Sequence, residues 1–355
     1  MGVDVLHGDC RGELTVYAPD TFDSVCTDPP YGLVEPRSGG SGPGRGTGVA
    51  FCPRTDEQKA KRRGGFMGKA WDAEVPGVDV WTEVLRVLKP GGYMLAMGGT
   101  RTYHRLACAV EDAGFELRDC LMWMYGTGFP KGQGCLKPAW EPILLARKPG
   151  PRVLPLGIDG CRVPTDGEQV PMFTTSGGRK FEQTHTQPER RTKCVGSSDI
   201  GRYPANVVHD GSDEVMEAFA AFGEKTSGKP CGVRRAKYAF GSTEETGTPL
   251  TGFGDTGTAA RFFYCAKAAK SERGEGNTHP TVKPLSLMRW MVRLVTPEGG
   301  RVLDPFAGSG STLVAAQLEG RDAVGVELDW AHCEIIKRRL AAAVVPEDLG
   351  LFQGV

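Results

Sequence analysis

The chain has 355 residues, of which 43 are Lys or Arg and 43 are Asp or Glu, so its formal net charge is zero. Its 39% of apolar residues is enough to build a hydrophobic core, which excludes a wholly disordered chain. No apolar run reaches the ~18–20 residues of a transmembrane helix, and the first ten residues lack the pattern of a secretory signal.

Three segments show strands alternating with helices. Residues 1–32 contain a short strand over 23–28. For residues 72–148 we expect a helix that begins at 79 and stops at Lys89-Pro-Gly-Gly92, a strand over 93–99, a helix over 102–115, and strands over 116–125 and 141–149. Residues 280–345 are predicted to form a strand, a glycine turn, a helix and a strand over 299–329, and a final helix over 330–344. This alternation predicts an α/β fold with a mainly parallel sheet covered on both faces.

Two segments do not fit this pattern. Residues 33–71 are rich in Gly and polar residues, which predicts a mobile loop, and residues 149–278 indicate a separate, loop-rich subdomain or insertion. The zero net charge is a cancellation, because residues 33–71 hold 8 basic and 3 acidic residues, residues 131–203 hold 12 and 7, and residues 225–273 hold 9 and 4. These three segments predict salt-sensitive binding to nucleic acid.

The glycine turn near the C-terminus has the clearest local mechanism. A strand ends at Asp304, and Gly308 and Gly310 allow a tight turn close to a ligand. We expect Ser311 or Thr312 to cap the helix that follows.

The strand after this helix ends in Glu327, which can accept hydrogen bonds from both hydroxyls of a ribose. A glycine-rich connection without any ligand is the alternative at this point. A P-loop is disfavoured because no Lys follows the glycines, and Leu313 stands where a nicotinamide-binding turn has its third Gly.

A second turn, Asp28-Pro29-Pro30-Tyr31, ends the first predicted strand. The two prolines stiffen the backbone and so hold a carboxylate, backbone carbonyls and an aromatic ring in one geometry. A carboxylate and a carbonyl can accept both N–H groups of an amino group on a planar ring, while the Tyr ring stacks on the ring's face. A proline-rich turn with a packing Tyr is the alternative.

Together these residues resemble the DNA amino-methyltransferases, which methylate adenine N6 or cytosine N4 with S-adenosylmethionine. Asp28–Tyr31 matches the catalytic motif and Asp304–Thr312 the cofactor motif of that family. His7-Gly-Asp-Cys10 and His279-Pro-Thr-Val-Lys-Pro284 match two further motifs. The catalytic motif comes first, as in the permuted β group.

The resemblance implies a Rossmann-like, mostly parallel sheet of seven strands with one antiparallel strand. It divides the chain into a catalytic half (1–148), a target-recognition region (149–278) and a cofactor-binding half (279–355). Asp28 and the Pro29 carbonyl would hold the target amine and Tyr31 would stack on the base. The expected contacts of S-adenosylmethionine are Asp9, Asp28, Thr281, Lys283, Asp304, Pro305, Phe306, Ala307, Gly308, Ser309, Gly310, Thr312 and Glu327.

Double-stranded DNA is the expected partner, and basic residues of the three positive segments are the expected contacts to it. A charge run is more often a solvated surface than a binding site, so this assignment depends on the resemblance. The residues are Lys59, Lys61, Arg62, Arg63, Arg179, Lys180, Arg190, Arg191, Arg234 and Arg235.

Asp at the first motif position favours adenine N6 over cytosine N4 within the family. The alternatives are cytosine-N4 methylation, a DNA-binding relative without turnover, and a nicotinamide oxidoreductase, which the glycine pattern disfavours. The His residues have no metal-binding spacing, so we expect no metal. Eleven Cys without C-x2-C spacing indicate reduced thiols in a bacterial cytoplasm, where a phage-encoded enzyme would also act, and dimerisation is left open.

Overall fold

The computed structural model describes seven ranges of the chain in full and four further strands by their backbone alone. The ranges are residues 2–32, 74–128, 136–151, 153–164, 201–226, 256–266 and 282–343. The four strands, which are described at the level of the backbone, are residues 170–176, 191–198, 233–237 and 243–249. The chain divides into two compact units: residues 1–124, 128–157 and 266–355 form the first, and residues 125–127 and 158–265 the second.

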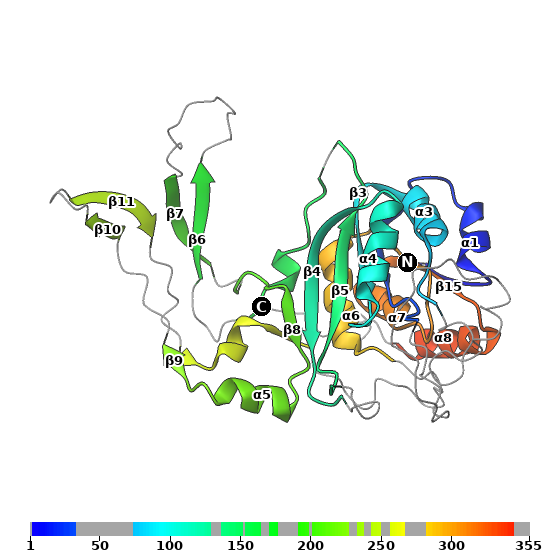
Figure 1. Ribbon diagram of the computed structural model, residues 1–355. Coiled ribbons are helices and arrows are strands. Elements are labelled where there is room, and N and C mark those ends of the chain that lie inside the picture. Colours follow the sequence, from blue (N-terminus) through cyan, green and yellow to red (C-terminus); the bar gives the residue numbers. More distant parts are fainter. Residues whose placement is uncertain are drawn as a thin grey trace, which may run out of the picture. The chain divides into compact units, whose positions relative to one another are not determined.

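The first unit alternates strands and helices along the chain (Figure 1). Its strands are β1 (Val3–His7), β2 (Phe22–Thr27), β3 (Leu88–Met97), β4 (Glu116–Met124), β5 (Trp140–Arg147), β14 (Arg301–Asp304) and β15 (Asp322–Glu327). Its helices are α1 (Cys10–Glu13), α3 (Val78–Val87), α4 (Tyr103–Asp112), α6 (Leu285–Val295), α7 (Ser311–Leu318) and α8 (Trp330–Ala342).

The strands of this unit form a sheet in the order β1-β15-β14-β2-β3-β5-β4. The pairs from β1 to β3 are parallel, whereas β5 runs antiparallel to both β3 and β4. Parallel neighbours need crossover connections, and the helices supply them. The expected Rossmann-like α/β sheet with a single antiparallel strand is therefore confirmed.

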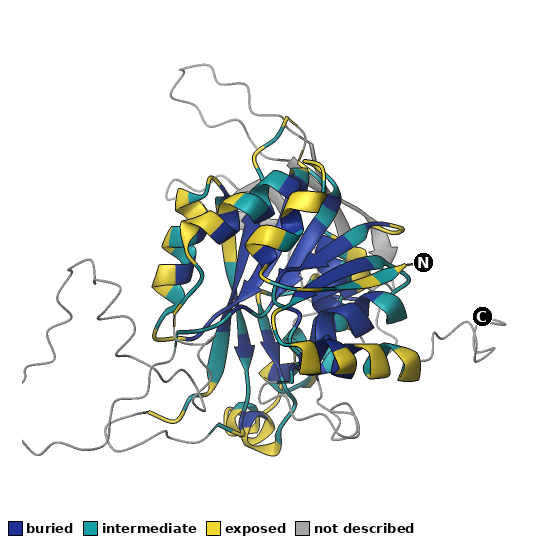
Figure 2. Ribbon diagram, turned by 90° about the vertical axis from the view of Figure 1, so that its right-hand side faces the viewer, coloured by how far each residue is buried: buried dark blue, intermediate teal, exposed yellow. Residues whose placement is uncertain are grey.

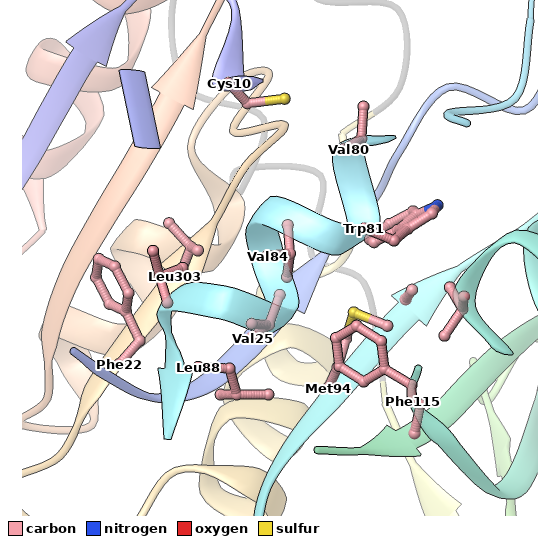
Figure 3. Close-up of a cluster of buried hydrophobic side chains, with 14 of the residues drawn as sticks. Cys10, Phe22, Val25, Val80, Trp81, Val84, Leu88, Met94, Phe115 and Leu303 are labelled. Carbon is pink, nitrogen blue, oxygen red and sulfur yellow. The ribbon is translucent and has the colours of Figure 1, made fainter. Parts of the chain in front are cut away.

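Helices cover the sheet, and their buried sides face it, as the dark strands and yellow outer helix faces of Figure 2 show. In α3, Trp81 and Val84 are fully buried against Val25 of β2 and Met94 of β3 (Figure 3). Their spacing places both side chains on one side of the helix, which is the amphipathic pattern that docks a helix onto a sheet.

Three elements of the first unit were not predicted from the sequence: β1, α1 and α6. Helix α3 stops before Lys89-Pro90-Gly91-Gly92 as predicted, because Pro90 cannot continue a helix and Gly91 has a φ of 84°, and the chain enters β3 at Leu88. Helix α6 was not predicted from the sequence, although its partly exposed residues Ser286, Arg289 and Arg293 lie on one face and the other side is buried.

The second unit is built from short elements. Its parallel pair is β8 (Val207–His209) with β13 (Tyr264–Cys265), and the helix α5 (Asp213–Ala220) lies between them in sequence. The Phe219 ring of α5 lies 6.0 Å from the ring of His209 and 5.7 Å from that of Phe263. The antiparallel pairs are β6 (Val170–Ser176) with β7 (Arg191–Ser198), β10 (Val233–Lys237) with β11 (Thr243–Pro249), and β9 (Lys225–Thr226) with β12 (Thr256–Gly257).

Among the helices described in the two units, none has the length and apolar character that crossing a membrane requires.

Trp81 lies in the core of the first unit: it is fully buried, and its ring lies 6.2 Å from that of Phe306. Its removal should therefore lower the free energy of unfolding strongly. Trp81→Ala is expected to lower the free energy of unfolding in urea by about 3–5 kcal/mol, since a large cavity remains. Trp330→Ala is the matched control: this Trp is 56% exposed, and the change should stay within about 0.5 kcal/mol. Equal losses in the two variants would contradict the packing described for α3.

Candidate active site

The candidate site lies where neighbouring parallel strands end. Strands β2 and β14 end at Thr27 and Asp304, and β15 and β1 end opposite each other at Glu327 and His7. Because parallel strands have their carboxyl ends at the same edge of a sheet, the turns that follow these strands lie along one edge. The catalytic and cofactor motifs predicted from the sequence are therefore neighbours, although they come from opposite ends of the chain.

A buried hydrogen bond connects the two motifs. The Thr27 hydroxyl donates to Oδ1 of Asp304 at 2.7 Å, and the backbone N–H of Phe306 donates to the same oxygen at 3.1 Å. Burial raises the pKa of Asp304 to about 6, and hydrogen bonds from Thr312, Thr27 and Phe306 oppose that rise. Asp304 therefore anchors the glycine turn to the end of β2.

The glycine turn after Asp304 has the backbone that the sequence predicts. Gly308 and Gly310 have φ values of 54° and 80°, which few other residues adopt without strain. A Cβ at Gly310 would also lie 2.9 Å from Ile336, so the position needs Gly on two counts. The expected cap is wrong: Gly310 itself is the N-cap of α7, and Ser311 and Thr312 are the first residues of the helix.

Glu327 is hydrogen-bonded to this turn. Its Oε2 accepts a hydrogen bond from the backbone N–H of Gly308 at 2.8 Å, and its Oε1 accepts one from the N–H of Asp329 at 2.8 Å. The Nδ1 atom of His332 lies 3.3 Å from the same Oε1. These hydrogen bonds hold the Glu327 carboxylate beside the glycine turn, which is the position that the predicted contact with a ribose requires.

Residues that the sequence did not single out also support the turn. Arg339 of α8 donates to the carbonyl of Ser309 at 2.6 Å and to the hydroxyls of Ser309 and Ser311 at 3.0 and 3.1 Å. A basic residue on a surface helix has no distinguishing sequence signal, so these contacts required the structure.

Asp9 lies at the N-terminus of α1 and accepts a hydrogen bond from the N–H of Arg11 at 2.9 Å. The Arg11 guanidinium donates to it as well, at 2.6 Å, and lowers the pKa of the Asp9 carboxyl. Its expected position near the adenine of the cofactor stays a prediction.

The catalytic turn holds Asp28 and Tyr31 beside an ammonium and a second carboxylate. The Nζ atom of Lys283 lies 3.3 Å from Oδ2 of Asp28, 3.0 Å from the Tyr31 hydroxyl and 2.8 Å from Oε2 of Glu141. The Tyr31 hydroxyl donates to the same Glu141 oxygen at 2.9 Å. We call these four side chains the Asp28 cluster.

The Asp28 side chain is partly buried, with 20% of its surface exposed. Burial raises the pKa of its carboxyl, the charge of Lys283 opposes that rise, and the charge of Glu141 adds to it. Among the described residues, the buried Oδ1 atom of Asp28 has no hydrogen-bond partner. Because buried carboxylate oxygens nearly always accept hydrogen bonds, this atom is an acceptor in need of a donor.

The structure thus brings Lys283 into contact with the catalytic turn, and its expected contact with the methionine end of the cofactor stays a prediction. Glu141 was missed because a single acidic residue in an apolar strand matches no motif. Thr281 lies outside the described residues.

All ten expected DNA contacts are residues whose side chains the structure does not describe. Arg191 lies on β7, and Arg234 and Arg235 lie on β10, all at the level of the backbone. Outside the described residues lie Lys59, Lys61, Arg62, Arg63, Arg179, Lys180 and Arg190. Among the residues that the structure describes, no three His, Cys, Asp or Glu side chains gather as metal ligands.

The chain is similar to known DNA methylases. The family model of the N6/N4 DNA methylases matches residues 22–338. The type II methyltransferase M.HindIII of Haemophilus influenzae is 53% identical over 62 residues, which are 18% of this chain and 20% of that protein. M2.DpnII of Streptococcus pneumoniae is 40% identical over 73 residues, 21% of this chain and 27% of that protein. The matched segments thus span about a quarter of these relatives' lengths.

Among solved structures, the cytosine-N4-specific PvuII DNA methyltransferase aligns with a TM-score of 0.48 and 14% identity, over 99% of this chain and 90% of that one.

The buried Asp304 predicts a pH-dependent difference in stability. Its pKa is raised from 3.8 to about 6, so the folded state binds this proton more tightly than the unfolded chain. Stability from this carboxyl is therefore greatest at low pH and is lost as pH rises through about 6. Relative to Asp304→Asn, the free energy of unfolding of the wild type should fall by up to about 3 kcal/mol between about pH 4 and pH 7.

Urea unfolding at a series of pH values measures this difference. The control is Asp4→Asn, whose side chain is 61% exposed and which should track the wild type at every pH. A difference between wild type and Asp304→Asn that does not change with pH would contradict the burial of the charge.

Proposed function

Because the chain belongs to the N6/N4 DNA methylase family, we propose that it transfers a methyl group to the exocyclic N6 of adenine at specific sites in duplex DNA. The family takes this methyl group from S-adenosylmethionine, the cofactor expected from the sequence. The single observation that carries the proposal is the partly buried Asp28 carboxylate, whose Oδ1 atom has no hydrogen-bond partner among the described residues, next to Tyr31 and at the edge where the glycine turn lies.

In this proposal the glycine turn and Glu327 hold the methyl donor. Glu327 would accept hydrogen bonds from the two ribose hydroxyls, and the Phe306 ring would pack against the cofactor. Asp9, the residue before helix α1 and after strand β1, would lie near the adenine of the cofactor. The two φ-positive glycines support this role, because the backbone can approach a ligand closely only where no Cβ intervenes.

The target amine would lie against Asp28. Its two N–H groups would donate to Oδ1 of Asp28 and to the carbonyl of Pro29, and the Tyr31 ring would stack on the base. An adenine within a duplex is inaccessible to this turn, so the base must be flipped out at a cost of about a few kcal/mol.

The reaction is a direct displacement. The lone pair of the amine attacks the sulfonium methyl carbon, an N–C bond forms while the S–C bond breaks, and sulfur keeps the electron pair of that bond. The nitrogen then carries the positive charge and loses one proton to the Asp28 carboxylate, which passes it to solvent. Positioning and charge complementarity supply most of the acceleration, so no covalent intermediate is needed.

Adenine is favoured over cytosine N4 because the catalytic motif begins with Asp28. Recognition of the DNA sequence is assigned to residues 149–278, and contacts to phosphates are assigned to the three positive segments. Charge neutralisation of that kind makes the affinity for DNA fall as salt rises.

Labelled S-adenosylmethionine and unmodified duplex DNA test the proposal directly. After digestion to nucleosides, label in N6-methyladenosine is the expected result. Label in N4-methylcytosine would overturn the choice of base. Cofactor binding without label in any DNA would identify a DNA-binding relative that does not turn over.

Asp28→Ala predicts loss of catalysis with little loss of stability. Without the carboxylate that holds the amine, the rate of methyl transfer should fall by at least about 10²-fold, while S-adenosylmethionine still binds. Asp4→Ala, an exposed Asp on β1, is the matched control and should retain the wild-type rate. A fully active Asp28→Ala variant would disprove the proposed role of the turn.

A further inference from the structure

Glu141 comes from outside the sequence motifs and still reaches the catalytic turn. It lies on β5, the antiparallel strand, directly opposite Trp123 of β4, and its side chain is 20% exposed. Its Oε2 atom accepts from two members of the Asp28 cluster at once, the Tyr31 hydroxyl at 2.9 Å and the Lys283 ammonium at 2.8 Å. One carboxylate oxygen therefore fixes both side chains that flank Asp28.

The Lys283 ammonium is shared between two carboxylates. Its side chain is 8% exposed, and its nitrogen lies closer to Glu141 (2.8 Å) than to Asp28 (3.3 Å). The same nitrogen lies 5.1 Å from the centre of the Tyr31 ring and 5.9 Å from that of Trp123, within the range of cation–π attraction. A buried ammonium that is held from several sides has a single favoured position. Lys283 can therefore fix the position of the Asp28 carboxylate.

We propose that Glu141 is a positioning residue for methyl transfer, which holds Lys283 and the Tyr31 hydroxyl so that Asp28 keeps an unpaired carboxylate oxygen for the target amine. The inference rests on the proposed function and deepens it. Without the Glu141 charge, Lys283 would have Asp28 as its remaining carboxylate partner in the cluster, and a closer ion pair would compete with the amine for the Asp28 oxygens.

The charges of the cluster suit the reaction. Asp28 and Glu141 are each negative and Lys283 is positive, so the cluster has a net charge of −1. Methyl transfer moves positive charge from sulfur onto the amine nitrogen, towards Asp28. A net negative cluster stabilises that change, whereas removal of the Glu141 charge would leave the cluster neutral.

The charged and titratable groups around Asp28 give the inference a pH signature. Lys283, before α6, and the Tyr31 hydroxyl lower the pKa of Asp28, while Glu141 on β5 raises it. Asp304, after β14, is coupled to Asp28 by like-charge repulsion. Loss of the Glu141 charge should therefore lower the pKa of Asp28, and loss of the Lys283 charge should raise it.

The test compares Glu141→Gln and Lys283→Met with the wild type in steady-state methylation of duplex DNA across pH. Glu141→Gln keeps the shape of the side chain and should lower kcat by about 10- to 100-fold while the Kd for S-adenosylmethionine changes less than about twofold. The acidic limb of kcat should move to lower pH in Glu141→Gln and to higher pH in Lys283→Met. Opposite shifts would not follow from a merely structural role.

Glu116→Gln is the matched control. Glu116 lies on β4 opposite Arg147, with which it forms an ion pair, at the other end of the same strand pair. This variant should keep the wild-type kcat and pH profile. If Glu141→Gln keeps the wild-type kcat and the acidic limb does not move, the inference about Glu141 is overturned. The proposed function would stand in that case, because the wild type still methylates DNA. A wild type that methylates no DNA would overturn the proposed function and the inference with it.

Discussion

The hydrogen bond from Thr27 to Asp304 joins the two halves of the site. Both side chains are almost fully buried, and they come from residues 277 positions apart in the chain. The adjacency of β2 and β14, with Leu303 opposite Val25, makes this contact. A buried carboxylate is costly unless hydrogen bonds satisfy it, and here donors from the catalytic strand and from the cofactor turn share that task. The geometry of each turn therefore depends on the other.

Lys283 has a similar place on the outer side of the catalytic turn. It precedes α6, yet its nitrogen contacts Asp28, Tyr31 and Glu141, so it joins the cofactor half of the chain to β2 and β5. Two polar contacts thus hold the catalytic turn: the hydrogen bond from Thr27 to Asp304 and the ion pair of Lys283 with Asp28. A site that is held in this way needs little rearrangement to accept a planar amine, which is where positioning contributes to catalysis.

The sequence predicted the parts of this arrangement that depend on local pattern. Most strands and helices of the first unit and both turns followed from apolar periodicity and from Gly and Pro, and the alternation of strands with helices indicated the sheet. The partners of Lys283 could not be predicted, because they depend on which strand lies next to β2, and Glu141 has no local signal. Helix α6 was missed although Ser286, Arg289 and Arg293 recur at helical spacing, so its sequence did carry the period that reveals a helix. The cap at Gly310 shows that a left-handed glycine can replace a Ser or Thr cap.

The central claim is that the catalytic turn and the glycine turn form one site for methyl transfer. A crystal structure of the chain with S-adenosylhomocysteine tests this claim most directly. In that structure we expect the two ribose hydroxyls to donate to Glu327 and the sulfur to face Asp28 and Tyr31. A ligand bound away from the glycine turn, or one whose sulfur points away from Asp28, would contradict it.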